Sequence, residues 1–288
     1  CRLRSGLGNQ LFQYAMARAT QLRLGTELRL DLAELLDPYP PAGYVPREYA
    51  LSDFRLSQQF LVPPTVLHSL YALPAGSRWR RGVRRLARRG YPLHQEPSFR
   101  VDLALLRAPV DNVIYRGFWQ SERYFQDFAV QIKADLCFRN PLPSTSVQLA
   151  RRMAAESAVG VHVRRRDTIG DPTHEVTDLG YYLRGMELIR GRYPDCNFYV
   201  FSDDVGWCQT HLGAISRLTI IPAEQGGHHF RLLTLCRHFL IPNSTFSWWA
   251  AWLGEREDSL VVAPARWFGT DKYDYRDVVP DRWRKLDN

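Results

Sequence analysis

Short apolar runs alternate with segments of helical period along most of the chain, a pattern typical of α/β folds with parallel sheets. The end of a strand at residues 1–4 is followed by apolar positions at helical spacing as far as Gly25. Strands are predicted at 27–32, 113–116, 159–163, 197–201, 218–221, 238–241 and 260–263, and helices near 122–136, 145–157, 181–193, 230–237 and 246–253. The second half therefore predicts a doubly wound, Rossmann-like domain.

The prolines indicate how the chain is divided. Seven of them between residues 38 and 74 predict an irregular insertion over 37–77. Two more, within Asn140–Ser144, lie between predicted helices and mark the expected domain boundary. We predict an N-terminal α/β domain over 1–142 and a C-terminal Rossmann-like domain over 143–288, and we allow for a last helix that returns to the first domain.

The composition excludes several classes of protein. Of the 288 residues, 45% are hydrophobic and 24% are charged, and no apolar run is long enough to span a membrane. These values exclude a disordered, collagen-like or integral membrane protein. The five cysteines are odd in number and contain no Cys-x-x-Cys pair, which favours a reducing compartment over a disulfide framework or a zinc ribbon. No signal peptide or anchor is recognisable.

The net charge of +8 comes almost entirely from one segment. Seven arginines and no acidic residue lie in residues 78–91, and without them the net charge is +1. An apolar stripe at helical spacing predicts a short helix there, whose basic face is either solvated or in contact with an anionic surface or membrane. The charge also keeps a basic nucleic-acid-binding protein as an alternative.

Polar residues that directly follow predicted strands are candidates for ligand binding, because parallel sheets bind ligands beyond the carboxyl ends of their strands. The first such segment is Gly6-Leu7-Gly8-Asn9-Gln10. Its glycines let a ligand approach the backbone, and Asn9 and Gln10 supply amide donors where a helix begins. A tight turn between a strand and a helix would also use these glycines.

The second segment is His162-Val163-Arg164-Arg165-Arg166-Asp167. The planar guanidinium of arginine fits phosphate oxygens, and Asp167 can pair with an arginine and hold it in place. Alternation along the strand is expected to send His162 and Arg164 to the same side. A solvated strand edge is the alternative.

The third and fourth segments carry carboxylates and hydroxyls. Asp203 and Asp204 can bind a divalent cation, accept hydrogen bonds from a base or sugar, or cap the next helix. Ser244, Thr245 and Ser247 gather at one helix N-terminus, which favours a phosphate, although one of them can be an ordinary N-cap. Asn243-Ser244-Thr245 also matches a glycosylation sequon, which this position disfavours. Together the four segments predict a site for a nucleoside diphosphate.

Five blocks of the chain, in this order, resemble the α-1,2-fucosyltransferases of glycosyltransferase family 11. They are Gly6–Ala15, Gly117–Phe125, His162–Asp167, Phe201–Asp204 and Asn243–Leu253. Arg166 stands where the basic motif of this family often has glycine, so the shape of this loop is expected to differ locally.

The resemblance implies a GT-B architecture, with two Rossmann-like domains facing across a cleft. It implies inverting, metal-independent transfer of L-fucose from GDP-β-L-fucose to the 2-hydroxyl of a terminal β-galactoside, with no cofactor. Donor binding would fall mainly to the second domain, and acceptor binding to the first domain and its insertions. Arg164 would bind the β-phosphate, and one of Asp203 and Asp204 would contact the guanine or ribose.

The resemblance also implies a set of site residues. The expected catalytic residues are Arg164, Asn9, His162 and Asp167. The expected donor-binding residues are Gly6, Gly8, Asn9, His162, Arg164, Arg165, Asp203, Asp204, Asn243, Ser244, Thr245, Phe246 and Ser247. Acceptor contacts are expected from Trp119, Gln120 and Glu122, and no metal ligand is expected.

Several alternatives stay open at this point. The acceptor can be lactose, a type 1 or type 2 chain, or the repeat unit of a surface polysaccharide. The catalytic base can be Glu122 or the leaving phosphate. Other nucleotide-sugar enzymes, such as an α-1,6- or O-fucosyltransferase or a metal-dependent glycosyltransferase, share parts of the pattern. A bacterial cytoplasmic enzyme without a nucleic-acid partner is expected, with a membrane-peripheral protein or a trimmed Golgi luminal domain as alternatives.

Overall fold

The computed structural model describes residues 1–37, 47–56, 59–63, 65–66, 91–222 and 228–288. The chain divides into two compact units, Cys1–Asn140 and Pro141–Asn288, so the division falls two residues before the predicted boundary. The predicted arginine-rich helix over 78–91 lies outside the described residues apart from Tyr91, and so does much of the predicted insertion over 37–77.

The second unit is built around six parallel strands. These are β3 (Ala158–Val163), β4 (Asn197–Ser202), β5 (Leu218–Ile220), β6 (His238–Leu240), β7 (Val261–Pro264) and β8 (Arg284–Leu286), in the spatial order β5-β4-β3-β6-β7-β8. Counted along this unit, the order is 3-2-1-4-5-6, that of the dinucleotide-binding Rossmann fold. The direction of winding reverses between β3 and β6, so a ligand is expected beyond the carboxyl ends of these two strands.

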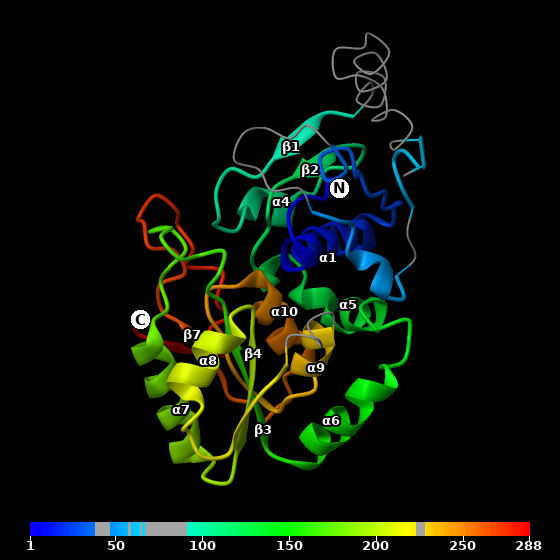
Figure 1. Cartoon of the computed structure of the whole chain (residues 1–288). Helices are drawn as coiled ribbons and strands as arrows, with labels where there is room; N and C mark the ends of the chain where they lie inside the picture. Colours follow the sequence, from blue (N-terminus) through cyan, green and yellow to red (C-terminus); the bar gives the residue numbers. More distant parts are fainter. Residues whose placement is uncertain (38–46, 57–58, 64, 67–90, 223–227) are drawn as a thin grey trace. The chain divides into compact units, whose positions relative to one another are not determined.

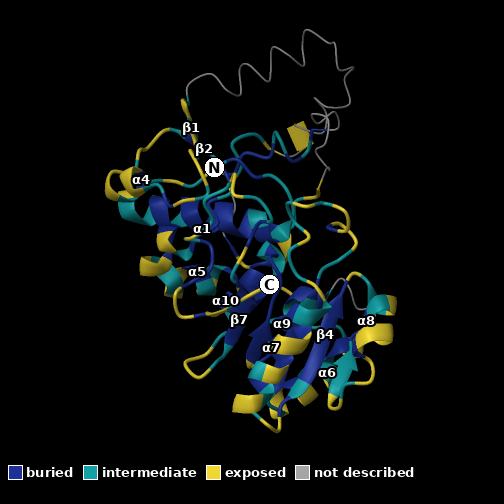
Figure 2. Ribbon diagram, turned by 90° about the vertical axis from the view of Figure 1, so that its left-hand side faces the viewer, coloured by how far each residue is buried: buried dark blue, intermediate teal, exposed yellow. Residues whose placement is uncertain are grey.

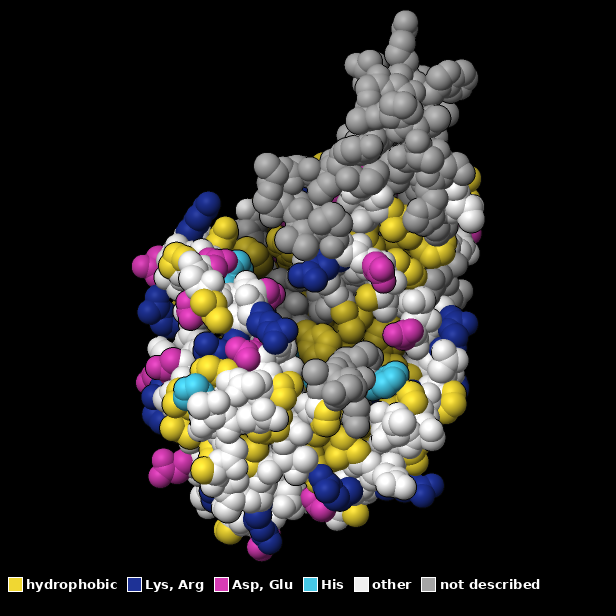
Figure 3. Space-filling view, in the orientation of Figure 1, with side chains coloured by type: hydrophobic (Ala, Val, Ile, Leu, Met, Phe, Trp, Pro, Cys, Tyr) yellow, Lys and Arg dark blue, Asp and Glu magenta, His cyan; other side chains and the backbone are white. Residues whose placement is uncertain are grey.

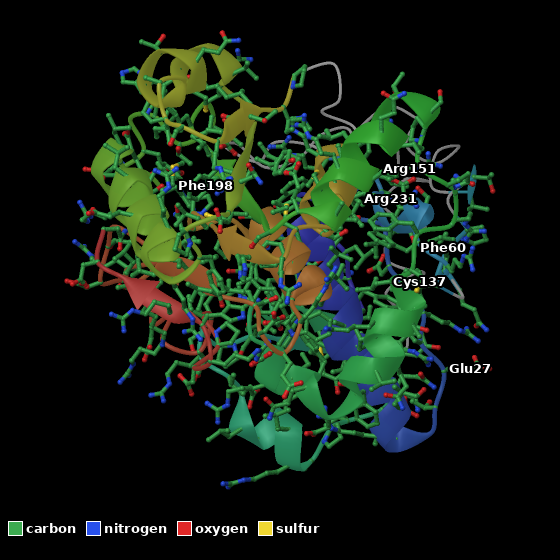
Figure 4. The ribbon with its side chains drawn as sticks, turned by 90° about the horizontal axis from the view of Figure 1, so that it is seen from below. Glu27, Phe60, Cys137, Arg151, Phe198 and Arg231 are labelled. Carbon is green, nitrogen blue, oxygen red and sulfur yellow. The ribbon has the colours of Figure 1, made fainter. Side chains whose placement is uncertain are left out.

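Helices cover both faces of this sheet. Helices α7 (Leu179–Arg192) and α8 (Val205–Leu212) lie on one face, and α6 (Ser144–Ala155), α9 (His229–Leu233) and α10 (Thr245–Gly254) lie on the other (Figure 1). Successive side chains of β3 point alternately to these two faces. Val159, Val161 and Val163 belong to the apolar core with α7 and α8, as does Phe198 of β4, which is labelled in Figure 4. Gly160 faces α9, where an added Cβ would lie 2.4 Å from the Leu233 side chain.

The first unit has a less regular sheet. Strands β1 (Leu93–Gln95) and β2 (Ile114–Arg116) pair in parallel, and the Arg2 N–H donates to the Tyr115 carbonyl oxygen at 2.9 Å. Single parallel bridges then join Arg2 to Asp31 and Leu30 to Phe60. The segments are thus arranged in the order 59–61, 29–31, 1–3, β2, β1, and the winding reverses between residues 1–3 and β2.

Helix α1 (Leu7–Leu24) is largely buried in this unit, as Figure 2 shows by its colour. It ends where Gly25 adopts a left-handed conformation with φ of 64°, as predicted. The remaining elements of the unit are η1 (Leu51–Asp53), α4 (Leu103–Arg107), η2 (Glu122–Tyr124), η3 (Gln126–Phe128) and α5 (Ala129–Asp135). No helix within the described residues has the length and apolar character needed to cross a membrane.

The structure corrects several predictions about the elements. The strand predicted at 27–32 is reduced to single bridges, and the helix predicted near 122–136 is divided into η2, η3 and α5. The last helix that we allow for, one that returns to the first domain, is not observed within the described residues. After α10 the chain stays in the second unit and ends with β8, which pairs with β7. Its sequence, Arg284-Lys285-Leu286, carries exposed charges at a sheet edge and therefore lacks an apolar strand signal.

Candidate functional site

Predicted site residues gather at the place of reversed winding in each unit, and each group is described by itself. In the second unit, Arg164, Asp167, Asn243 and the N-terminus of α10 form what we call the phosphate cluster. In the first unit, Ser5, Asn9 and Gln120 form what we call the amide cluster.

Arg164 joins the ends of the two central strands of the second unit. Its Nε and Nη2 each donate to a carboxylate oxygen of Asp167 at 2.8 Å. Its Nη1 donates to the backbone carbonyl oxygen of Asn243 at 3.2 Å. These bonds use three of the five N–H groups of a guanidinium, so the group is held in a fixed orientation with donors to spare. Asp167 therefore orients Arg164, as the sequence predicts.

Helix α10 begins two residues after Asn243, whose carbonyl oxygen accepts a hydrogen bond from the Arg164 guanidinium. Ser244 is the N-cap, but its side chain makes no capping hydrogen bond. Ser247 is fully buried, and its hydroxyl donates to the Ser244 carbonyl oxygen at 3.3 Å, so it is not offered to a ligand. Ser244 and Thr245 remain as predicted hydroxyl donors. An uncapped helix N-terminus beside an arginine is a favourable environment for an anion such as phosphate.

His162 contacts Phe246, the second residue of α10, with ring centroids 5.3 Å apart. Its Nδ1 is buried and has no hydrogen-bond partner among the described residues. Burial lowers the pKa of His162 to about 3, and the positive charge of Arg164 acts in the same direction. The ring is therefore neutral near pH 7 and can exchange hydrogen bonds with a ligand without adding charge.

The two carboxylates after β4 have separate structural tasks. Asp203 accepts the backbone N–H groups of Arg165 at 2.9 Å and Arg166 at 3.0 Å, one on each oxygen. Asp204 caps α8 by accepting the Trp207 N–H at 3.2 Å. The capping role was among the predicted alternatives, whereas the support that Asp203 gives to the loop was missed. The pairing of β3 with β4 could have predicted this support, because it places the ends of the two strands, and so Arg165 and Asp203, side by side.

Arg165 and Arg166 differ from Arg164 in their surroundings. The Arg165 guanidinium carbon lies 4.3 Å from the centre of the Trp207 ring, and its Nε lies 3.5 Å from Asp204. Arg165 is therefore engaged with α8 and its cap. The backbone of Arg166 does not have a positive φ, so this position does not need glycine.

Asn243 is buried, with 5% of its surface exposed. Its Nδ2 donates to the backbone carbonyl oxygens of His174 at 2.9 Å and Trp267 at 3.1 Å. The side chain thus ties two loops to the end of β6 and leaves its backbone carbonyl oxygen to Arg164. A glycan on this nitrogen does not fit the folded structure, in agreement with the interpretation of the sequon.

The amide cluster connects the start of α1 with the end of β2. Asn9 Nδ2 donates to Ser5 Oγ at 2.9 Å, and Gln120 Nε2 donates to Asn9 Oδ1 at 2.8 Å. Gly6 is the N-cap of α1, with open space where a Cβ would be, and Gly8 is buried in the first turn. Space for a close approach to the backbone therefore exists at Gly6.

Three further predicted residues of the first unit lie in different surroundings. The Gln10 side chain donates to the carbonyl oxygens of Ser5 and Glu48, so it ties the chain near residue 48 to α1 rather than offering free donors. Trp119 is fully buried, so its ring is not exposed to an acceptor in this structure, and its expected acceptor contact stays a prediction. Glu122 lies half-buried at the start of η2.

The carboxylates and histidines do not form a metal centre within the described residues, where no group of three or more His, Cys, Asp or Glu side chains could hold an ion. Asp203 and Asp204 are the nearest candidates by sequence, and both already accept backbone N–H groups.

The chain is similar to known glycosyltransferases. The family model described as glycosyl transferase family 11 matches residues 97–285. An α-1,2-colitosyltransferase from Escherichia coli is 26% identical, with 99% of this chain and 98% of the relative covered. A galactoside α-(1,2)-fucosyltransferase 2 from Rattus norvegicus is 36% identical over 33% of this chain and 29% of its own length.

Solved structures are similar in fold. The fucosyltransferase NodZ from Bradyrhizobium has a TM-score of 0.50 at 19% identity, with 86% of this chain and 90% of that chain covered. A mutant of Arabidopsis thaliana FUT1 in complex with GDP has a TM-score of 0.50 at 14% identity, with 92% of this chain and 70% of that chain covered. Together with the parallel α/β units, these similarities confirm the predicted GT-B fold class.

Proposed function

Because the chain belongs to glycosyl transferase family 11, we propose that it transfers L-fucose from GDP-β-L-fucose to the 2-hydroxyl of a terminal β-galactoside. The proposed reaction inverts the anomeric centre and uses no metal. Membership of this family itself makes the chain a fucosyltransferase-like glycosyltransferase.

The phosphate cluster is the observation that carries the proposal. Departure of GDP increases negative charge on the β-phosphate while the sugar gains positive charge. The held guanidinium of Arg164 and the uncapped N-terminus of α10 supply hydrogen-bond donors that are already oriented for such a charge. A preorganised donor of this kind stabilises the transition state more than the ground state, and it performs without a cation the task that a metal ion has in other transferases.

The amide cluster supports a role of the first unit in sugar recognition. Amide groups exchange hydrogen bonds with sugar hydroxyls, and the Oε1 of Gln120 is buried without a partner among the described residues. We therefore assign the donor nucleotide to the second unit and sugar recognition to the first.

A second candidate differs only in the transferred sugar. One of the relatives that align over 99% of this chain is an α-1,2-colitosyltransferase, which favours GDP-colitose as an alternative donor. Colitose is L-fucose without its 3-hydroxyl group. A site that hydrogen-bonds this hydroxyl would reject colitose strongly, because a buried polar group would lose its partner.

The test is a transfer assay with both donors in excess EDTA. The acceptors are lactose, a type 1 chain, a type 2 chain and a β-galactoside-terminated polysaccharide repeat unit, and NMR spectroscopy gives the linkage and anomeric configuration of each product. We expect an α-1,2-linked product that forms equally well with and without EDTA. A product with another linkage, a strict requirement for Mn²⁺, or the lack of transfer to any β-galactoside would contradict the proposal. The ratio of kcat/KM for the two donors decides between fucose and colitose.

A further inference from the structure

The carboxylate of Glu96, which was not among the predicted site residues, binds the turn that leads to Gln120 of the amide cluster. Glu96 follows β1 directly, and its Oε2 accepts the Phe118 N–H at 2.6 Å while its Oε1 accepts the Trp119 N–H at 2.9 Å. Its own N–H donates to the Arg116 carbonyl oxygen at 2.9 Å, so Glu96 is anchored to β2. One side chain thus binds two consecutive backbone donors of the turn that follows β2.

Gly117 makes this approach possible. A Cβ added at Gly117 would lie 2.4 Å from the Glu96 Cβ and 2.6 Å from its Oε2. Any side chain at this position would push the carboxylate away from the turn. The glycine that opens the Gly117–Phe125 block is therefore explained by a contact with Glu96.

The turn has an unusual backbone at Trp119, whose φ is 55°. A left-handed conformation is uncommon for a bulky residue and persists only where its surroundings hold it. Two features do so here. Glu96 binds the Trp119 N–H, and the indole is packed against Tyr115 and Tyr124 with centroids 6.1 Å and 5.5 Å away.

This turn determines the position of Gln120, the residue after Trp119. The side chain is 6% exposed, and its Nε2 is bonded to Asn9 while its Oε1 lacks a partner among the described residues. A buried carbonyl oxygen without a partner is costly, and a ligand hydroxyl can satisfy it. It lies where the winding of the first sheet reverses, the place at which such sheets bind ligands.

We propose that Glu96 is a positioning residue of the sugar site: its carboxylate fixes the Gly117–Gln120 turn, so that Gln120 Oε1 accepts a hydrogen bond from a sugar hydroxyl. This inference rests on the proposed function. The hydroxyl belongs either to the acceptor or to the transferred sugar, and separate kinetic measurements for the two substrates distinguish these sources.

The position of Glu96 makes the turn sensitive to pH. Burial raises the pKa of Glu96 to about 7, the bonds to Phe118 and Trp119 oppose this shift, and the charge of Asp102 adds to it. Below this pKa the carboxyl group is protonated, and the protonated oxygen no longer accepts a backbone N–H well. Activity that depends on the turn is therefore lost as the pH falls through about 7. The titratable and charged groups around the turn are Arg4, which lies over the Phe118 ring, its partner Glu34, His94 of β1, Asp102 before α4, Tyr115 and Arg116 of β2, and Tyr124 of η2.

The decisive variant is Glu96→Gln. Its amide NH₂ replaces one of the two carboxylate oxygens, so one backbone N–H of the turn faces a donor and loses its acceptor. Steady-state kinetics from pH 5.5 to 8.5 should show that wild-type kcat/KM falls below pH 7 and that this acid limb is absent in the variant. At pH 8 we expect a rise of about tenfold in the KM of one substrate, from the loss of an ordered hydrogen bond. A rise in the galactoside KM assigns the hydroxyl to the acceptor, and a rise in the GDP-fucose KM assigns it to the transferred sugar.

Controls separate this effect from unfolding. Glu156→Gln changes a half-buried glutamate of the second unit that accepts the Tyr199 hydroxyl, and it should leave the acid limb in place. GDP affinity, measured by calorimetry, should be the same in all variants. Gln120→Leu keeps Glu96 but removes the oxygen that the turn positions, so it should raise the same KM and also lose the acid limb. This variant tests the inference if Glu96→Gln loses GDP binding.

The outcomes distinguish the two proposals. A wild-type chain that transfers no sugar contradicts the proposed function. An active wild-type chain whose Glu96→Gln variant keeps both its KM values and its acid limb contradicts only the role of Glu96, as does a Gln120→Leu variant with unchanged KM values.

Discussion

At the scale of single residues, the second unit depends on the way one guanidinium is held. Arg164 has a carboxylate on one side and a backbone carbonyl oxygen on the other, so its orientation is set before any ligand binds. Lysine carries the same charge, but its ammonium group cannot make the paired contact with Asp167 and also reach Asn243. Charge alone therefore does not reproduce this part of the site.

This geometry predicts the effects of two substitutions. Arg164→Lys should lower kcat by about 10²- to 10³-fold, the typical cost of losing one preorganised donor. Asp167→Asn keeps the arginine but weakens its support, and should lower kcat by about tenfold. Arg237→Lys is the matched control, because Arg237 pairs with Asp258 and precedes β6 at the opposite end of that strand. Near-normal turnover of Arg164→Lys with GDP-fucose would show that the guanidinium does not have this role.

At the scale of elements, α7 packs closely on the sheet at the last residue of β6. A Cβ added at Gly185 would lie 2.5 Å from the Leu240 side chain, so this side chain packs directly on the backbone of the helix. Gly191, on the same helix, has open space where a Cβ would be. Leu240 is the last residue of β6, and Asn243 follows after a short loop.

The two glycines should respond in opposite ways to alanine. Gly185→Ala should destabilise the fold by about 1–3 kcal/mol, the usual cost of overpacking a core. Gly191→Ala should stabilise it by about 0.5–1 kcal/mol, because alanine is the better helix former. Chemical denaturation of both variants measures the difference. Equal stability would mean that α7 does not pack on Leu240 as closely as described.

The elements also show what the sequence could predict. The strands β3, β4, β6 and β7 are largely buried, mainly apolar runs and were predicted within about two residues. Strand β1 was missed because Leu-His-Gln is short and largely exposed, and α8 was missed although its N-cap Asp204 was noticed. Short elements carry too few periods for a pattern to be recognised.

The same reasoning applies to the site. Arg164 and Asn243 were predicted together because both follow strands that a doubly wound sheet makes neighbours. Glu96 could not be predicted in this way, since it follows an unrecognised strand and acts through the backbone of a distant turn. The left-handed conformation of Trp119 was equally hidden, because no local residue preference favours it.

At the scale of the whole molecule, the second unit has an apolar core of its own. The second unit has an apolar cluster formed only from its own residues, drawn from four strands of its sheet together with α7 and α8. On the face seen in Figure 3, basic and acidic side chains of the described residues are interspersed. That mixture agrees with the charge count, which assigns the basic excess to residues 78–91.

The separate core predicts that residues 141–288 fold when produced alone. Because the phosphate cluster lies entirely within this unit, the fragment should bind GDP with an affinity within about tenfold of that of the full chain, yet transfer no sugar. Circular dichroism and calorimetry test the two parts of this prediction. A folded fragment without affinity for GDP would contradict the assignment of the nucleotide to the second unit.

The burial of Asn243 has a practical consequence for producing the protein. N-linked glycans are attached to a chain before its folding is complete, so a host that glycosylates secreted proteins could modify Asn243 while it is still accessible. Such a chain would lose both bonds of the side-chain amide to the loops at His174 and Trp267, next to the carbonyl oxygen that holds Arg164. A cytosolic expression host avoids this modification and keeps both bonds, whereas mutation of Asn243 prevents glycosylation but removes the same two bonds.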